Sequence, residues 1–263
     1  MNNSRYQTIV STWIVVLVTL WLTSLSIGYV KAESSGCENC HKDAKFFVEN
    51  RKIYQYYQDW LTSPHKAAGL ACNDCHGGDA QSNDADTAHQ DVFSTSDARS
   101  RVFYQQQPQT CGECHAVETE LFEQSDHYQG LLDQADAPTC STCHRAMNRR
   151  PYFQNLVENT CRTCHYENNE DQLPLVADKA EQILHRMNVS KGYLNWSSLY
   201  FRSKDWPDNS KATIDALETE FHDILAVVHR FNLRRSDRAS VELLTKLKLL
   251  YQEVSEQGDD ESE

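Results

Sequence analysis

Basic residues are scarce in this chain of 263 residues. Its 25 lysines and arginines are outnumbered by 38 aspartates and glutamates, and the formal net charge is -13. Proteins that bind nucleic acid need a basic surface, so this balance argues against nucleic acid as a partner. An acidic surface instead favours a protein partner with a basic face, because complementary potentials steer the two molecules toward each other.

Apolar side chains are also few, at 40% of the residues. That fraction is low for a chain long enough to form one or two domains around a conventional core. We therefore infer that large apolar cofactors fill part of the interior. Methionine is nearly absent, and its three copies are Met1, Met147 and Met187.

Residues 1–32 are expected to form either a secretory signal peptide or an N-terminal membrane anchor. A polar start that contains Arg5 is followed by a mostly apolar segment, residues 9–30. This segment is long enough to span a bilayer, so membrane association through it is one possibility. The other is removal by signal peptidase, which accepts small residues at the third and first positions before the cut.

A cut after Ala32 fits this rule, because the chain reads Val30-Lys31-Ala32 there. Cleavage would remove two positive charges, Arg5 and Lys31, and no acid, which changes the net charge from -13 to -15. Both alternatives carry residues 33–263 across the inner membrane. We therefore expect a periplasmic protein, soluble after cleavage or anchored to the membrane.

All ten cysteines occur in five copies of one pattern, C-x-x-C-H. Each copy holds two cysteines three positions apart, and a histidine follows directly. The cysteines are Cys37 and Cys40, Cys72 and Cys75, Cys111 and Cys114, Cys140 and Cys143, and Cys161 and Cys164. The histidines that follow them are His41, His76, His115, His144 and His165.

C-x-x-C-H is the attachment sequence for c-type haem. Two thiols at this spacing can each add to one vinyl group of a haem, and the adjacent histidine then ligates the iron from the proximal side. A zinc site pairs two C-x-x-C units but does not require a histidine after each one, and a disulfide framework has no use for the histidines. Five copies with no cysteine left over predict five covalent haem c groups.

Six further histidines are candidates for the distal side of the irons: His65, His89, His127, His185, His222 and His229. The first three follow a hydroxyl residue by two positions and precede the second, third and fourth motifs, which suggests a repeated ligation unit of histidine, linker and motif. The last three lie in stretches that favour helix, and two of them, seven positions apart, share a helix face. Because methionine is scarce, we expect mostly bis-histidine, low-spin haems of low potential.

The fold is expected to be mainly α with extensive loops, with a haem-packed core and a C-terminal helical hairpin. Residues 33–170 form the pentahaem region, in which the closeness of the motifs forces haems against one another. We expect a helix over residues 44–62, where apolar residues recur at near-helical spacing, and a polar surface loop over residues 77–100.

A helical region is expected over residues 171–257, followed by an acidic, disordered tail over residues 258–263. The first helix of this helical region is predicted over residues 172–187. Ser210 and Ser236 are predicted to cap two antiparallel helices that end near Phe231 and Val254. Their apolar stripes are Ile214, Leu217, Phe221, Ile224 and Val228 in one, and Val241, Leu244, Leu247, Leu250 and Val254 in the other.

The segment Trp60–Gly78, which contains Ser63-Pro64-His65, Gly69 and Cys72–His76, resembles a known group of multihaem cytochromes. The group includes the tetrahaem electron carrier of ammonia oxidation, hydroxylamine oxidoreductase and pentahaem nitrite reductase. The resemblance implies little sheet and haems in stacked and perpendicular pairs. This chain departs from the enzymes: no motif ends in lysine, as the catalytic motif of the nitrite reductases does. It also has five motifs where hydroxylamine oxidoreductase has eight, with no matching catalytic tyrosine.

These observations favour periplasmic electron transfer between redox partner proteins, and no catalytic residue is assigned. One alternative is an oxidoreductase that acts on a small nitrogen or sulfur oxyanion, or on hydroxylamine, at a haem with an open position. Candidates to attract such an anion are Arg99, Arg101, Arg149 and Arg150. A second alternative is a membrane-anchored module that oxidises quinol.

Overall fold

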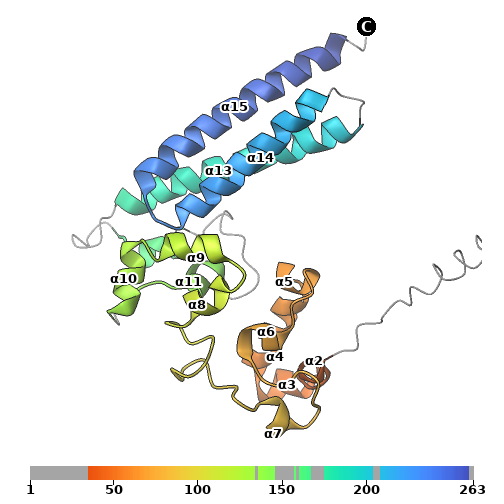
Figure 1. Cartoon of the computed structure of the whole chain (residues 1–263), viewed down its shortest axis with the longest axis vertical. Helices are drawn as coiled ribbons and strands as arrows, with labels where there is room; N and C mark the ends of the chain where they lie inside the picture. Colours follow the sequence, from red (N-terminus) through yellow and green to blue (C-terminus); the bar gives the residue numbers. More distant parts are fainter. Residues whose placement is uncertain are drawn as a thin grey trace, which may run out of the picture. The chain divides into compact units, whose positions relative to one another are not determined.

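The computed structural model describes residues 35–133, 136–145, 157, 160–166, 175–203 and 208–260. These residues are mainly helical, and no strand occurs among them, which confirms the predicted fold class. Short helices joined by loops form the motif region, and three long helices follow it (Figure 1).

Four of the five motifs lie in or at the end of a short α-helix, and the fifth lies in a 3-10 turn. Cysteines three positions apart, with a histidine one further on, come to the same side of a single helical turn. The local fold therefore brings both thiols and the imidazole of each motif to one side of the chain, as the predicted haem attachment requires. The elements are α2 (Gly36–His41), α6 (Cys72–His76), α8 (Gln107–Gly112), α11 (Cys140–His144) and η1 (Cys161–Thr163).

The helix predicted over residues 44–62 is two helices, α3 (Lys45–Glu49) and α4 (Arg51–Leu61). Asn50 separates them, because its backbone (φ -148°, ψ 70°) leaves the helical region. Trp60 is the buried anchor at the end of α4, and its indole nitrogen donates to the carbonyl of Leu70 at 3.1 Å. This bond ties α4 to the approach of the second motif.

The stretch over residues 77–100 is largely loop, as predicted, apart from one helical turn, α7 (Ala85–Ala88). Asp84 caps this turn, because its carboxylate accepts from the backbone nitrogen of Thr87 at 3.0 Å. The remaining helices of the motif region are α5 (Pro64–Ala67), α9 (Ala116–Phe122) and α10 (Asp126–Leu132).

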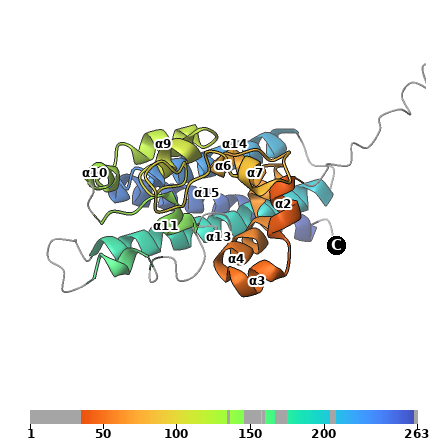
Figure 2. The same cartoon turned by 90° about the horizontal axis from the view of Figure 1, so that it is seen from below.

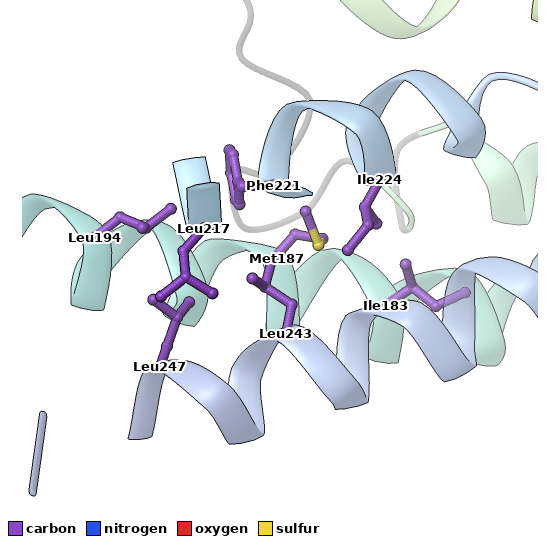
Figure 3. Close-up of a cluster of buried hydrophobic side chains, with 8 residues drawn as sticks. All are labelled: Ile183, Met187, Leu194, Leu217, Phe221, Ile224, Leu243 and Leu247. Atoms are coloured by element: carbon purple, nitrogen blue, oxygen red, sulfur yellow. The ribbon is translucent and has the colours of Figure 1, made fainter. Parts of the chain in front are cut away.

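The C-terminal helices α13 (Leu175–Ser203), α14 (Asp208–Val228) and α15 (Leu233–Asp260) pack against one another (Figures 1 and 2). The antiparallel pair α14 and α15 was predicted, whereas α13 runs well beyond residue 187 and turns the pair into a three-helix bundle. The core of the bundle is a cluster of side chains from all three helices, drawn in Figure 3. They are Ile183, Met187, Leu194, Leu217, Phe221, Ile224, Leu243 and Leu247.

The predicted start of α15 is incorrect. Ser236 lies inside the helix and is buried, while the side chain of Asn232 caps the helix by accepting from the backbone nitrogen of Arg235 at 3.1 Å. Val241, placed on the apolar stripe by sequence, is 47% exposed, and Leu243 occupies the core instead. The same correction applies at α14, where Ser210 follows the helix start at Asp208.

Helix α15 also ends later than Val254. It continues to Asp260 and so includes the first part of the segment expected to be disordered, whereas residues 261–263 lie outside the described residues.

Helices α13 and α15 approach each other closely along small buried residues. Ser190, Ser197, Ser236 and Ser240 are all 1% exposed or less. Beside them, Asp237 accepts from Lys179 at 3.0 Å and from Arg186. The hydrogen bond from Lys179 lowers the pKa of Asp237, and the charge of Arg186 adds to this shift. These contacts set the register between the first and last helices.

None of the helices in the described part of the chain has the length and apolar character needed to cross a bilayer. The apolar segment at residues 9–30 lies outside the described residues.

Two leucines of α15, one buried in the bundle core and one exposed, provide a matched pair of substitutions. Leu247→Ala should lower the free energy of unfolding by about 2–5 kcal/mol, because Leu247 is fully buried and truncation leaves a cavity. Leu249→Ala should change it by less than about 0.5 kcal/mol, because Leu249 is 55% exposed. Denaturant unfolding of the haem-loaded protein, followed by far-UV circular dichroism, measures both. Equal losses in the two variants would contradict this packing.

Candidate haem-binding site

All ten cysteines lie within the described residues and are free thiols, so none is committed to a disulfide. Thiols of successive motifs lie near one another, and the Cys111 thiol hydrogen-bonds Cys140, which raises the pKa of Cys111. Burial raises the pKa of Cys143 to about 12 and that of Cys72 to about 11. The motifs therefore meet in consecutive order. Seven of the ten cysteines are partly buried, and Cys40, Cys75 and Cys114 are exposed.

At least one of the two variable positions of each motif contacts another part of the chain. In the first motif, Glu38 pairs with Lys66 at 3.5 Å, next to the distal candidate His65. The amide of Asn39 donates to Asn83 at 3.3 Å, in the loop that leads to α7. The first motif is thus joined to both segments that supply nearby distal candidates.

The second, third and fourth motifs also contact other segments through their variable positions. Arg101 bridges the second and third motifs, because its guanidinium donates to Glu113 at 2.7 and 2.8 Å and to the carbonyl of Asp74 at 3.4 Å. The backbone nitrogen of Ser141, in the fourth motif, donates to Gln107 on α8 at 3.0 Å.

The fifth motif is held to the bundle. Arg162 lies between its two cysteines and pairs with Asp178 and Glu181 of α13, each at 2.9 Å. The charged side chain inside the motif therefore fixes where the fifth haem would sit relative to α13.

Four of the motif histidines face a second histidine ring across a nearly constant distance. The ring centres are 6.0–6.2 Å apart in every pair, while the angle between ring planes ranges from 8° to 81°. The pairs are His41 with His89 at 6.1 Å, His115 with His65 at 6.2 Å, His144 with His229 at 6.0 Å, and His165 with His127 at 6.0 Å.

This spacing fits a metal ion between the two rings. A bond from a metal to an imidazole nitrogen is about 2 Å long, and the ring centre lies about 1 Å beyond that nitrogen, so two axial imidazoles have centres about 6 Å apart. Direct contact between two imidazoles would bring them closer. The four pairs therefore have the geometry of the two axial ligands of a haem iron.

Hydrogen bonds fix the tautomer of two of the distal rings. The Nδ1 atom of His89 lies 2.8 Å from the carbonyl of Ala85, and that of His229 lies 2.9 Å from the carbonyl of Leu225. A ring that donates from Nδ1 to a carbonyl keeps the lone pair on Nε2 for a metal. Burial lowers the pKa of His41, and the facing His89 adds to this shift. This favours the neutral form that ligates iron.

A local motif explains how His65 and His127 are placed. Ser63 caps α5 by accepting from the backbone of Lys66 at 3.2 Å, and Ser125 caps α10 by accepting from Tyr128 at 3.2 Å. In both helices the histidine is the second residue after the serine, so the hydroxyl residue noted in the sequence is a helix cap.

The two serines share a second feature that the sequence could have revealed. Each hydroxyl also donates to the carbonyl of a buried aromatic residue three positions earlier, Trp60 for Ser63 and Phe122 for Ser125. The repeated pattern is therefore aromatic, two residues, serine, one residue, histidine. Thr87 does not take this role for His89, because α7 is capped by Asp84.

The sequence left open which distal histidine belongs to which motif, and the pairing in the structure does not follow the order of residues along the chain. His65 faces the third motif rather than the second, and His127 faces the fifth rather than the fourth. His89 faces back to the first motif. In each pair, another C-x-x-C-H motif lies between the two histidines in the sequence. The proposed haem sites are therefore interlocked along the chain.

Three histidines stand outside these pairs. All eleven histidines lie within the described residues, and no histidine ring there faces His76 as the others are faced. His185 on α13 and His222 on α14 are exposed. The structure does not bring either of them to a motif histidine.

The sequence analysis also named methionines and arginines. Met187 is buried in the bundle core, and Met147 lies outside the described residues. Arg99 pairs with Asp97 at 2.7 Å, and Arg101 is held by Glu113. Arg149 and Arg150 also lie outside the described residues.

Paired histidines set on C-x-x-C-H motifs are typical of proteins that attach several haems covalently. The chain is 28% identical over 159 residues to the C-type polyheme cytochrome OmcB of Geobacter sulfurreducens, in strains DL-1 / KN400 and ATCC 51573 / DSM 12127 / PCA. The match covers 52% of this chain and 20% of the relative, so the chain spans about a fifth of the length of the curated relatives it matches. This similarity supports a multihaem c-type cytochrome. No family model and no solved structure matches the chain.

Gly78 allows the loop that carries His89 to approach the second motif. Its φ is +82°, and a Cβ atom there would lie 2.4 Å from the carbonyl oxygen of Ala88, next to His89. That same carbonyl accepts from the backbone nitrogen of Asp79 at 3.1 Å. A side chain at position 78 would therefore displace the segment that holds His89 opposite His41.

We expect Gly78→Ala to convert one low-spin haem, the haem bound by Cys37 and Cys40, to a high-spin form in the haem-loaded protein. Gly69→Ala is the control, because Gly69 also has a positive φ, +87°, but has nothing within 4 Å of the added Cβ. Both variants carry a backbone cost of about 1 kcal/mol. Electron paramagnetic resonance (EPR) distinguishes them, and a new high-spin signal in both variants would rule out the steric explanation.

Proposed function

We propose that this chain is a periplasmic electron-transfer protein that carries five haem c groups. The observation that carries the proposal is the set of four opposed histidine pairs at 6.0–6.2 Å. An iron with two axial histidines exchanges electrons without offering a coordination site to a substrate. The protein then acts by setting the potentials of the haems and the distances between them.

The contacts between consecutive motifs support passage of electrons along the chain. Arg101 joins the second motif to the third, the Cys111 thiol meets Cys140 of the fourth, and Cys161 of the fifth is near enough to Cys143 to contribute to its raised pKa. At the other end, desolvation lowers the pKa of His76 and the nearby His41 adds to the shift. Haems attached at these sites would form one connected series.

The acidic composition supports a redox partner with a basic face. The N-terminal segment allows two alternatives: a soluble electron carrier, or a membrane-anchored module that receives electrons from quinol. Both use the same haem series, and they differ in whether residues 9–30 are retained.

A second candidate function arises at the second motif. His76 is the one motif histidine without a facing ring among the described residues, and the two remaining histidines, His185 and His222, are exposed elsewhere. A haem on Cys72 and Cys75 would then have an open sixth position. Such a haem could bind a small nitrogen or sulfur oxyanion or hydroxylamine, with the other four haems supplying or removing electrons.

Haem quantification and EPR of the oxidised protein test both candidates together. We expect five haems per chain, four of them low-spin and one high-spin, and we expect the reduced protein to bind one carbon monoxide. Five low-spin haems without carbon monoxide binding would leave electron transfer as the only function. A protein with fewer than four low-spin haems would contradict the paired-histidine assignment.

Helix α14 provides a matched test of one distal ligand. We expect His229→Met to change the spectrum and raise the potential of a single low-spin haem, because His/Met ligation has a higher potential than bis-histidine ligation. His222→Met, seven positions earlier and within α14, should leave every haem signal unchanged, because His222 is exposed and faces no motif histidine. Redox titration with EPR detection measures both, and a wild-type spectrum for the His229 variant would exclude it as a ligand.

A further inference from the structure

The connection between α14 and α15 has an unusual backbone. Phe231 has a φ of +56°, a region that bulky side chains rarely adopt because Cβ crowds the backbone. Such a residue persists only where its surroundings hold it in place. Phe231 also lies two positions after His229, which faces the fourth motif.

The ring of Phe231 contacts a distal histidine of a different haem site. It lies edge-on to His127, with ring centres 4.3 Å apart and planes at 82°, and it also meets the edge of Phe122 at 6.3 Å. Edge-to-face packing of aromatic rings is directional, so it restricts rotation of both partners. The unusual backbone at the corner thus points an aromatic ring at the imidazole that faces His165.

His127 lacks the hydrogen bond from Nδ1 to a backbone carbonyl that orients His89 and His229. Those two lie at the C-terminal end of a helix or just after one, where Nδ1 reaches the carbonyl four residues earlier. His127 is near the start of α10, so no carbonyl of its own helix precedes it by four. Its Nδ1 atom is buried, and no group in the described part of the chain hydrogen-bonds it.

We propose that Phe231 is the positioning residue that orients the imidazole of His127 on the fifth haem. The proposal rests on the proposed function, in which His127 and His165 are axial ligands of the haem on Cys161 and Cys164. The orientation of an axial imidazole affects the EPR signal and the potential of a low-spin haem, as do other contacts to the ligands. One connection therefore presents the distal ligand of the fourth haem and orients that of the fifth.

The test uses Phe231→Gly in the full-length, haem-loaded protein. Glycine adopts a positive φ without strain, so the variant removes the ring while relieving the backbone. We expect the EPR signal and potential of one low-spin haem to shift, with the other haem signals unchanged. His127→Met identifies the haem concerned, because it should alter that same signal. Phe231→Tyr keeps the ring and should retain the wild-type signal.

Phe231→Asn is a second ringless variant that tolerates a positive φ, and it separates loss of the ring from any effect of glycine on folding. A wild-type spectrum for both ringless variants, together with an altered spectrum for His127→Met, would overturn the role of Phe231 while leaving the ligand pairing intact. Changes spread over all haems in both ringless variants would also overturn it. If His127→Met itself alters no low-spin signal, the pairing of His127 with His165 fails, and with it this part of the proposed function.

Discussion

Two imidazoles facing each other across about 6 Å are the constraint on which the motif region depends. The distance is too long for direct packing of the rings and suits an iron between them. Each pair joins segments that are far apart in the chain, as His144 on α11 and His229 beyond α14 show. In a region with few apolar side chains, shared ligation of a haem would supply the long-range connections that a hydrophobic core provides in other proteins.

The molecule combines two ways of holding helices together. The motif region uses short helices whose contacts run through the variable positions of C-x-x-C-H, such as Glu113 with Arg101 and Arg162 with α13. The C-terminal bundle uses conventional packing, with Leu243 and Leu247 against α13 and α14. The bundle reaches the haem sites at two places, where Arg162 meets α13 and where His229 and Phe231 face the fourth and fifth motifs. In the proposed haem series, the bundle would therefore hold the sites of the fourth and fifth haems.

The sequence predicts the haem attachment sites because covalent chemistry requires a fixed local spacing. Which histidine faces which motif could not be read in the same way, since pairing is a tertiary property: His65 lies close in sequence to the second motif yet faces the third. The bundle shows a similar division. The helices were recognisable from periodicity, but α15 has leucines at 243, 244, 247, 249 and 250. Only packing on α13 and α14 decides which of them are buried. The cap predicted at Ser236 was wrong because this serine is buried in the contact between α13 and α15.

The pairing of distant histidines also bears on how the molecule matures. In a chain that emerges from its N-terminus, His65 is available before the third motif and His127 before the fifth, each on a short helix with its own serine cap. The fourth haem differs, because His229 comes 85 residues after His144 (229 minus 144) and depends on a helix that packs only when the bundle has formed. The fourth iron would therefore be the last to gain its second histidine, and its coordination would report that the whole chain has folded.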